Sequence, residues 1–398
     1  MNGGGLQWLF GCLLVCSSTC YTPLEGRSFI FYYLWYGNTT KDRAWQHWDH
    51  EVLPHWRESE NKRYSNIGQR FKPPGDLHSP FYPQRGPYSS MDPALLDEHF
   101  AEIKSLSPSL VIVLSWWGQA SKKGTSDTQG VQTDNRIAGV LKAAERTGVL
   151  IAWHLEPYPG RSARSVTEDV RYLESKYGSS PAVLREAGKA VFFIYDSYHV
   201  SAEDWQRELG SKKGPKGIFI GLWLERHHGT DVLEGGFDGF YSYFASAGFV
   251  YGATPRNWPH MCAEAKVRDM ACILSVGPGY VDEGIRPWNS HNTKDRRGGA
   301  YFDDMFAAAL EARPTSVSIT SYNEWGEGTQ IEPAVPYTHA ATGREYVDYG
   351  EGGPNLYLNR TKLWLSRFAD LTAPVTGGFY DPYEGAKAPV APPEPPDL

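Results

Sequence analysis

Cysteine is scarce in this sequence. Five cysteines occur in 398 residues, and three of them, Cys12, Cys16 and Cys20, lie near the N-terminus. HExxH and paired CxxC motifs are absent, so the sequence has no zinc-binding pattern of recognisable spacing. Only Cys262 and Cys272 remain in the body of the chain. They could form a disulfide in an oxidising compartment, a question that their spacing alone leaves open.

Basic clusters and nucleotide-binding loops are also missing. The formal net charge is −7 and the isoelectric point is about 6.0, which does not support binding to nucleic acid. No GxGxxG or Walker loop follows an apolar run, and no GxSxG elbow is present. We therefore expect no nucleic-acid partner and no cofactor.

No apolar run is long enough to span a membrane comfortably. The most apolar segment, residues 6–15, is shorter than the roughly 20 residues that a spanning helix needs. Small residues follow it, which is typical of a secretory signal peptide, although the basic segment that opens such a peptide is missing. We interpret residues 1–20 as a signal peptide or a short signal anchor, so an N-terminal membrane anchor stays open.

Apolar and aromatic runs recur along the rest of the chain. Most are continuously apolar, as expected of parallel strands covered on both faces. About eight such runs occur, at residues 29–36, 110–117, 149–156, 190–196, 217–225, 237–244, 271–276 and 315–324.

The segments between these runs show helical patterns. Asp92 and Pro93 form an N-cap and N1 pair, and Gly148 would end a helix that begins near Ile137. Strands alternating with helices about eight times predict a (β/α)₈ TIM barrel at residues 28–372. An open doubly wound sheet is the competing fold, which the missing nucleotide loops disfavour.

Two stretches fall outside the alternation. Residues from about 38 to 87 form a long loop after the first strand, and loops of this length in a compact domain are usually functional or disordered. Residues 384–398 are rich in proline, and we predict a disordered tail there.

Carboxylates and aromatic rings gather where the predicted strands end. In a TIM barrel those ends meet at one face, which carries the active site. Aromatic side chains make up 14% of the residues; ordinary core and surface packing explains most of them, but such rings also commonly stack on sugars. The ring of side chains at the strand ends predicts a carbohydrate cleft, to which we assign Tyr36, Trp117, Glu156, Tyr195, Tyr241, Tyr243, Arg286 and Asn289.

The last strand leads into two glutamates. Glu324 and Glu327 flank Trp325 in a loop that contains glycines. Glycoside hydrolysis needs two neighbouring carboxyl groups, one to donate a proton and one to accept a proton or attack. We predict that Glu324 and Glu327 are the catalytic pair.

Histidine pairs offer a competing chemistry. His47 and His50 flank Asp49, and His227 is followed by His228. Neither set has the spacing of a familiar zinc site, so we predict no catalytic metal. A metal-dependent hydrolase stays an alternative that chelator sensitivity would reveal.

Several of these motifs together resemble glycoside hydrolase family 99, the endo-α-mannosidases and endo-α-1,2-mannanases. The resemblance runs from about residue 29 to 368. It rests on residues 31–37, 114–117, 154–158, 195–198, 236–239, 275–280, 285–289 and 323–332, the last reading Asn-Glu-Trp-Gly-Glu-Gly-Thr-Gln-Ile-Glu.

The resemblance implies a TIM barrel that hydrolyses internal α-mannosidic bonds with retention and without a catalytic metal. Glu324 matches the base that deprotonates the 2-hydroxyl of the −1 mannose, which gives a 1,2-anhydro sugar. Glu327 matches the general acid. Tyr36, Glu156 and Tyr243 match positions that line the −1 region.

Trp117 matches the aromatic residue of the −2 pocket. In the family, tyrosine there accompanies animal enzymes that cleave glucosylated mannose, and tryptophan accompanies bacterial enzymes that prefer mannose. The substrate is thus an N-glycan arm or an α-mannan, and a barrel that binds mannosides without cleaving them is an alternative. We expect a secretory-pathway protein, in the Golgi lumen or secreted. The oligomeric state stays open, with a monomer as the default.

Overall fold

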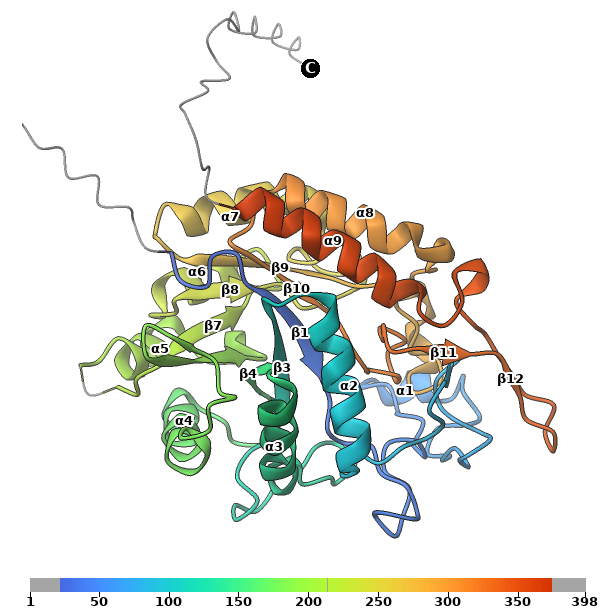
Figure 1. The fold of residues 1–398 in the computed structure, drawn as a ribbon. Coiled ribbons are helices and arrows are strands. Elements are labelled where there is room, and N and C mark those ends of the chain that lie inside the picture. Colours follow the sequence, from blue (N-terminus) through green and yellow to red (C-terminus); the bar gives the residue numbers. More distant parts are fainter. Residues whose placement is uncertain (1–21, 213, 374–398) are drawn as a thin grey trace, which may run out of the picture.

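Eight parallel strands close into a barrel in this computed structural model, which describes residues 22–212 and 214–373 (Figure 1). The order around the barrel is β1-β3-β4-β6-β7-β8-β9-β10, and β10 pairs with β1 again. The strands are β1 (Ser28–Tyr32), β3 (Leu110–Trp116), β4 (Leu150–Leu155), β6 (Lys189–Ile194), β7 (Ile218–Leu222), β8 (Gly239–Tyr241), β9 (Ala271–Val276) and β10 (Ser316–Ile319). The predicted (β/α)₈ barrel is confirmed. The predicted segments 1–20 and 384–398 lie outside the described residues.

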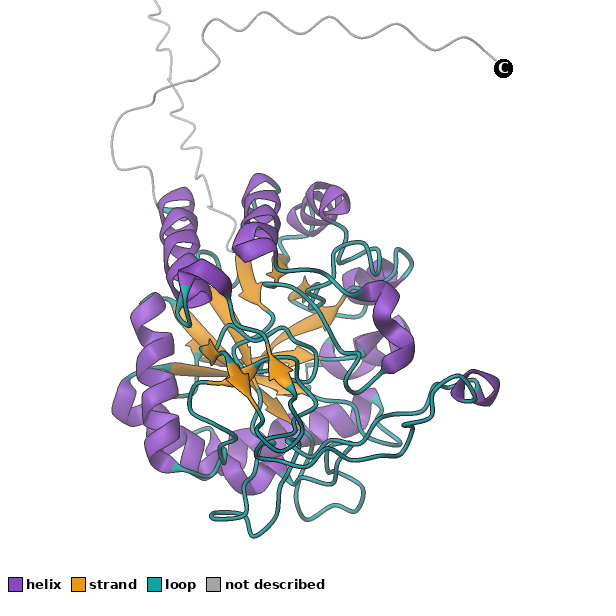
Figure 2. Cartoon of the chain, turned by 90° about the vertical axis from the view of Figure 1, so that its right-hand side faces the viewer, coloured by secondary structure: helices purple, strands orange, loops and turns teal. Residues whose placement is uncertain are grey.

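A helix follows each barrel strand, and Figure 2 shows the helices as a ring around the strands. The predicted caps are present: the Asp92 side chain accepts a hydrogen bond from the amide of Ala94, and Gly148 ends its helix at φ 71°. The helices are α2 (Pro93–Leu106), α3 (Ile137–Thr147), α4 (Ala163–Tyr177), α5 (Ala202–Leu209), α6 (His228–Glu234), α7 (Trp258–Lys266), α8 (Ala300–Glu311) and α9 (Leu356–Thr372).

The long loop after β1 has local structure of its own. It contains α1 (Glu58–Asn61) and β2 (Tyr82–Pro83), and β2 pairs with β11 (Ala334–Val335) from the loop after β10. The two longest loops at this end of the barrel are therefore joined. Other short pieces are β5 (Arg185–Glu186), the hairpin β12 (Tyr337–Thr338) and β13 (Glu345–Tyr346), and 3₁₀ turns at Thr133–Arg136, Ser197–His199, Pro255–Asn257, Pro287–Asn292, Arg297–Gly299 and Gly350–Gly352.

Several strands are shorter than the apolar runs predicted, and three of them, β1, β8 and β10, border the site. β1 ends at Tyr32 rather than at residue 36, because the amide of Tyr33 bonds the Asn323 side chain instead of a neighbouring strand. β8 is limited to Gly239–Tyr241, and Tyr243 has φ 55°, which an extended strand does not allow. β10 ends at Ile319, so the glutamate pair lies wholly in the following loop. Apolar character continues past these strands because the loops are themselves buried.

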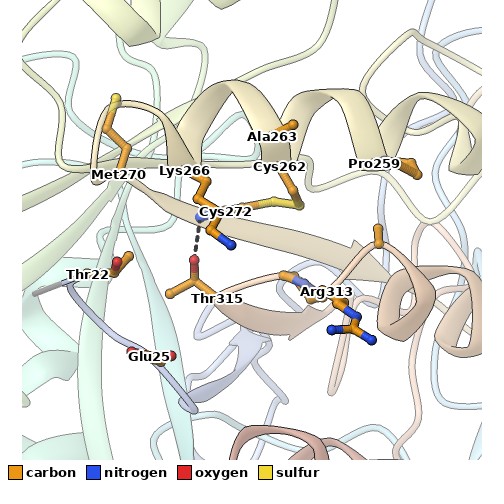
Figure 3. A pocket seen from close by; sticks show the side chains of 12 residues that line it. Thr22, Glu25, Pro259, Cys262, Ala263, Lys266, Met270, Cys272, Arg313 and Thr315 are labelled. Atoms are coloured by element: carbon orange, nitrogen blue, oxygen red, sulfur yellow. Dashed lines mark hydrogen bonds between the residues drawn. A yellow bond between two sulfur atoms is a disulfide. The ribbon is translucent and has the colours of Figure 1, made fainter. Parts of the chain in front are cut away.

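A disulfide joins α7 to β9 at the end of the barrel where the strands begin. Cys262 and Cys272 are bonded, with Cα atoms 5.2 Å apart, and Figure 3 shows the bond beside a pocket. The amide of Cys272 donates to the Thr315 hydroxyl. Gly26 and Thr372 are neighbours, so both ends of the described chain meet near this end. In the described part of the chain, no helix has the length and apolarity to cross a membrane.

Candidate active site

A cavity of about 160 Å³ opens at the carboxyl ends of the barrel strands. It collects side chains that lie far apart in the sequence, as the strand-end argument predicted. Seven of the ten predicted site residues line it: Glu324, Glu327, Trp117, Glu156, Tyr195, Tyr243 and Arg286.

The other three predicted residues lie behind the cavity wall. The Tyr36 hydroxyl donates to the carbonyl of Asn323 and accepts from the amide of Trp325, so it supports the glutamate loop. Tyr241 bonds His154, and Asn289 donates to Asp282. Direct contact of Tyr36, Tyr241 or Asn289 with a sugar stays a prediction.

The two glutamates face the cavity with different partners. The amide of Gly326 donates to Oε1 of Glu324 at 2.9 Å, while the buried Oε2 has no hydrogen-bond partner among the described residues. Glu327 accepts from Arg286 at 3.3 Å, and Arg286 also lies 3.1 Å from Asp282. One carboxyl oxygen of Glu324 is thus left for a ligand, whereas Glu327 is oriented by a cation.

Burial raises the pKa of both glutamates that we predict to be catalytic. The neighbouring charge of Glu327 raises the pKa of Glu324 further, and Arg286 opposes the rise at both groups. Double ionisation of the pair is therefore less favourable than it is for two glutamates in water. One protonated and one ionised carboxyl group is the state that acid–base cleavage of a glycosidic bond requires.

A third carboxylate, Glu156, is held from behind. Its Oε1 accepts from the Ser115 hydroxyl at 2.8 Å and lies 2.9 Å from Nδ1 of His154. The other ring nitrogen of His154 is 2.9 Å from the hydroxyl of Tyr241. This chain fixes the carboxylate on one side and leaves its other oxygen at the cavity.

Stacked aromatic rings form one wall. Trp35 stacks between Tyr33, at 4.5 Å between ring centroids, and His47, at 4.2 Å. Trp117 lies 6.4 Å from Trp35, and the hydroxyls of Tyr33 and Tyr243 hydrogen-bond each other. Aromatic faces next to carboxylates suit a pyranose, which has an apolar face and a polar edge.

The long loop contributes residues that the sequence argument did not assign. It brings His47, His50, Leu53 and His78 to the cavity. Burial lowers the pKa of His50 to about 3 and lowers that of His78 well below its ordinary value, so both rings are neutral at physiological pH. In the sequence, the pair His47 and His50 indicates only a possible metal site. Across the described ranges, no three His, Cys, Asp or Glu side chains gather as a metal-binding group.

A fully buried carboxylate supports the catalytic loop. Glu332 accepts from the Tyr88 hydroxyl at 2.7 Å and from the Trp325 indole at 3.0 Å, and it lies 3.0 Å from Nε2 of His99. Trp325 stands between the two catalytic glutamates. Arg296 adds two hydrogen bonds to the carbonyls of Gly328 and Gln330. The loop is therefore fixed before any substrate binds.

The fold and the site define a class. A buried and a partly buried carboxyl group, an aromatic wall and a cation beside one carboxyl group, at the carboxyl end of a TIM barrel, form the kind of site that a glycoside hydrolase needs.

The chain belongs to glycosyl hydrolase family 99, whose family model matches residues 23–370. A glycoprotein endo-alpha-1,2-mannosidase-like protein of Danio rerio is 41% identical over 352 residues, covering 85% of this chain and 78% of the relative. The glycoprotein endo-alpha-1,2-mannosidase of Rattus norvegicus is 40% identical over 359 residues, with 87% and 76% covered. The solved structure of the family 99 endo-alpha-mannosidase from Bacteroides thetaiotaomicron superposes with a TM-score of 0.78 at 36% identity, covering 88% of this chain and 99% of that one.

Proposed function

We propose that this enzyme is a retaining endo-α-mannosidase that cleaves an internal α-mannosidic bond through a 1,2-anhydro sugar. The observation that carries the proposal is the pair of Glu324, which is buried, and Glu327, which is partly buried, in one cavity, with the Oε2 of Glu324 unpartnered among the described residues. That oxygen suits a base for a sugar hydroxyl, because it needs no partner exchange before it accepts a proton.

In the first step, Glu324 takes the proton of the 2-hydroxyl of the −1 mannose. The 2-oxygen bonds C1 while the bond from C1 to the leaving oxygen breaks, and Glu327 donates its proton to that oxygen. In the second step, Glu327 takes a proton from water, the water oxygen bonds C1 and the epoxide bond from C1 to the 2-oxygen breaks. Glu324 returns its proton to the 2-oxygen, and the two inversions at C1 give retention.

Two glutamine variants test the catalytic pair. E324Q and E327Q keep the side-chain shape but remove the proton transfer, so each should lose at least 100-fold in kcat on a mannoside with a poor leaving group. A good leaving group, such as an aryl oxide, should restore activity to E327Q much more than to E324Q, because it departs without protonation. Full activity of either variant on the poor leaving group would sink the assignment.

The chemistry of the −1 sugar separates the epoxide route from a carboxylate nucleophile. A substrate whose −1 mannose carries hydrogen or fluorine instead of the 2-hydroxyl cannot close the epoxide, so it should not turn over. Intact-mass spectrometry should also show no sugar adduct on the protein. A trapped glycosyl ester on Glu324 would establish the nucleophilic alternative instead.

Trp117 bears on the sugar preferred at −2. Its indole lies beside Trp35 on the aromatic wall, and the buried indole N–H has no hydrogen-bond partner among the described residues. We take mannose at −2 as the preferred sugar, in an α-mannan or a deglucosylated N-glycan arm. A digest of two oligosaccharides tests this, one ending in Glc-α-1,3-Man and one in Man-α-1,3-Man, with the products sized by mass. Faster release of the Glc-Man disaccharide would favour glucosylated N-glycans, and cleavage of neither would favour a non-catalytic mannoside-binding barrel.

We propose further that the enzyme works in the secretory pathway. The bond between Cys262 and Cys272 fits an oxidising compartment. Immunolocalisation of the full chain, combined with protease protection, distinguishes a luminal from a secreted or anchored protein.

A further inference from the structure

One tryptophan is unlike the others in the described chain. Trp56, in the long loop, is 75% exposed, whereas every other described tryptophan is buried or half-buried. A single exposed apolar side chain is ordinary on a protein surface. The surroundings of Trp56, however, connect it to the catalytic cavity.

Trp56 belongs to a small aromatic ledge, which we define as His55, Trp56 and Trp288. The rings of His55 and Trp56 stack at 3.7 Å between centroids, and Trp288 presents its edge to Trp56 at 5.0 Å. The indole of Trp56 is thus supported on two sides while one large part of its surface remains in solvent.

The ledge is held in place by polar contacts. The amide of His55 donates to the Asn61 side chain at 2.7 Å, and the amide of Arg57 donates to Nδ1 of His55 at 2.9 Å. The segment is therefore folded against α1 rather than extended into solvent. An aromatic face that is already oriented loses less conformational entropy when a ligand binds.

The ledge is continuous with the cavity wall. The Trp288 indole donates to the carbonyl of Leu53, and the amide of Leu53 donates to the carbonyl of Ile285. Leu53, Ile285 and Arg286 all line the cavity. Two segments, 53–56 and 285–288, thus run from the cavity to the ledge side by side.

The ledge lies on the side of the general acid. Arg286 contacts Glu327 at 3.3 Å, and Trp288 is two residues further along the same segment. A general acid stands beside the glycosidic oxygen, so the leaving part of the substrate extends from its side of the site. Arg57 and Glu58, which follow Trp56 directly in the chain, are exposed and offer hydrogen-bonding groups.

We propose that the aromatic ledge binds a pyranose ring of the leaving part of the same oligosaccharide, beyond the sugar next to the cleaved bond. This inference rests on the proposed function, because the direction of the substrate follows from the role of Glu327. The apolar face of the sugar stacks on Trp56, and its hydroxyls remain available to Arg57, Glu58 and water. The ledge makes the enzyme prefer long substrates over short ones.

Kinetics on two substrates test the inference. Both carry the same non-reducing end, and one has a single mannose after the cleaved bond while the other has four or more. For W56A, kcat/KM on the long substrate should fall about tenfold, as expected for loss of one stacking contact, and should change less than twofold on the short one. W56F should retain most of the wild-type preference for length. L363A, which removes an exposed apolar side chain from α9, is the matched control and should change neither value.

The outcomes separate the two proposals. Equal losses on both substrates would mean that Trp56 acts only through the structure of its loop, and unchanged kinetics on the long substrate would mean that no sugar binds there. Either result overturns the ledge and leaves the proposed function intact. Failure of the wild-type enzyme to cleave either substrate would instead contradict the proposed function.

Discussion

Replacing Glu332 with glutamine should impair catalysis from a site that no substrate touches. Glu332 is fully buried, and its carboxylate accepts hydrogen bonds from Tyr88 and Trp325 and lies beside His99. Glutamine keeps the shape but not the charge, and one of its two terminal groups becomes a donor. Hydrogen bonds to a charged group contribute about 1.5–3 kcal/mol each, and part of this is retained by a neutral acceptor.

We expect E332Q to lower the free energy of unfolding by about 2 kcal/mol and E332A by about 4 kcal/mol, because alanine leaves its partners unsatisfied and opens a cavity. For a chain of this size the melting temperature should fall about 2 °C for each kcal/mol. The indole of Trp325 would lose its fixed partner, and Trp325 lies between the two proposed catalytic glutamates in the loop. A shift of the carboxyl groups by a fraction of an ångström should lower kcat about tenfold, with little effect on KM.

Thermal unfolding and steady-state kinetics on one purified preparation check both effects. E311Q, which changes an exposed glutamate of α8 in the same way, is the control. If E332Q melted and turned over like the wild type, the buried carboxylate would not support the loop. If E332Q lost stability but kept its kcat, the network would stabilise the fold without positioning the glutamates.

Three further predictions follow from the charges and the disulfide. Burial raises the pKa of Glu324 above its ordinary value near 4.5, so Glu324 ionises at lower pH in the unfolded chain than in the folded one, and its carboxyl group lowers stability at neutral pH. E324Q should therefore have a higher melting temperature than the wild type at pH 7 but not at pH 4. Equal melting temperatures at pH 7 would contradict the raised pKa. Arg286 lowers the pKa of the carboxyl groups of Glu324 and Glu327, so both pKa values should rise in R286M. The pH profile of the residual kcat/KM should therefore move to higher pH. A shift to lower pH would show that another charge dominates. Changing Cys262 and Cys272 together to alanine removes the disulfide and should lower the free energy of unfolding by about 2–3 kcal/mol, measured by chemical unfolding. The change should leave kcat as it is, because the bond lies at the other end of the barrel from the cavity. A large fall in kcat of the folded variant would contradict this separation.

The sequence predicted the barrel because its signals were local and repeated. Continuous apolar runs, the Asp92 cap and Gly148 each report the structure of their own neighbourhood, and both caps are observed. Strand ends then predicted seven of the cavity residues, because a TIM barrel brings those ends together whatever the loops do.

The sequence could not predict what the long loop contributes. His50 and His78 have no periodic pattern around them, and their place at the cavity depends on pairing between β2 and β11, which are about 250 residues apart. Nor could a strand-end rule separate a lining residue from one behind the wall. Tyr36 belongs to the same aromatic run as Tyr33, and only the three-dimensional path after β1 decides which of them reaches the cavity.

The nearness of Gly26 to Thr372 has a practical consequence. Both ends of the described chain leave the domain at the face where the strands begin, while the catalytic cavity opens at the face where they end. A partner protein, a solid support or a lipid attached at either end would sit behind the enzyme and leave its mouth open to a bulky glycan. The same nearness makes the domain a suitable scaffold for circular permutation, since a short linker could join the ends and new ones could be opened in an exposed loop.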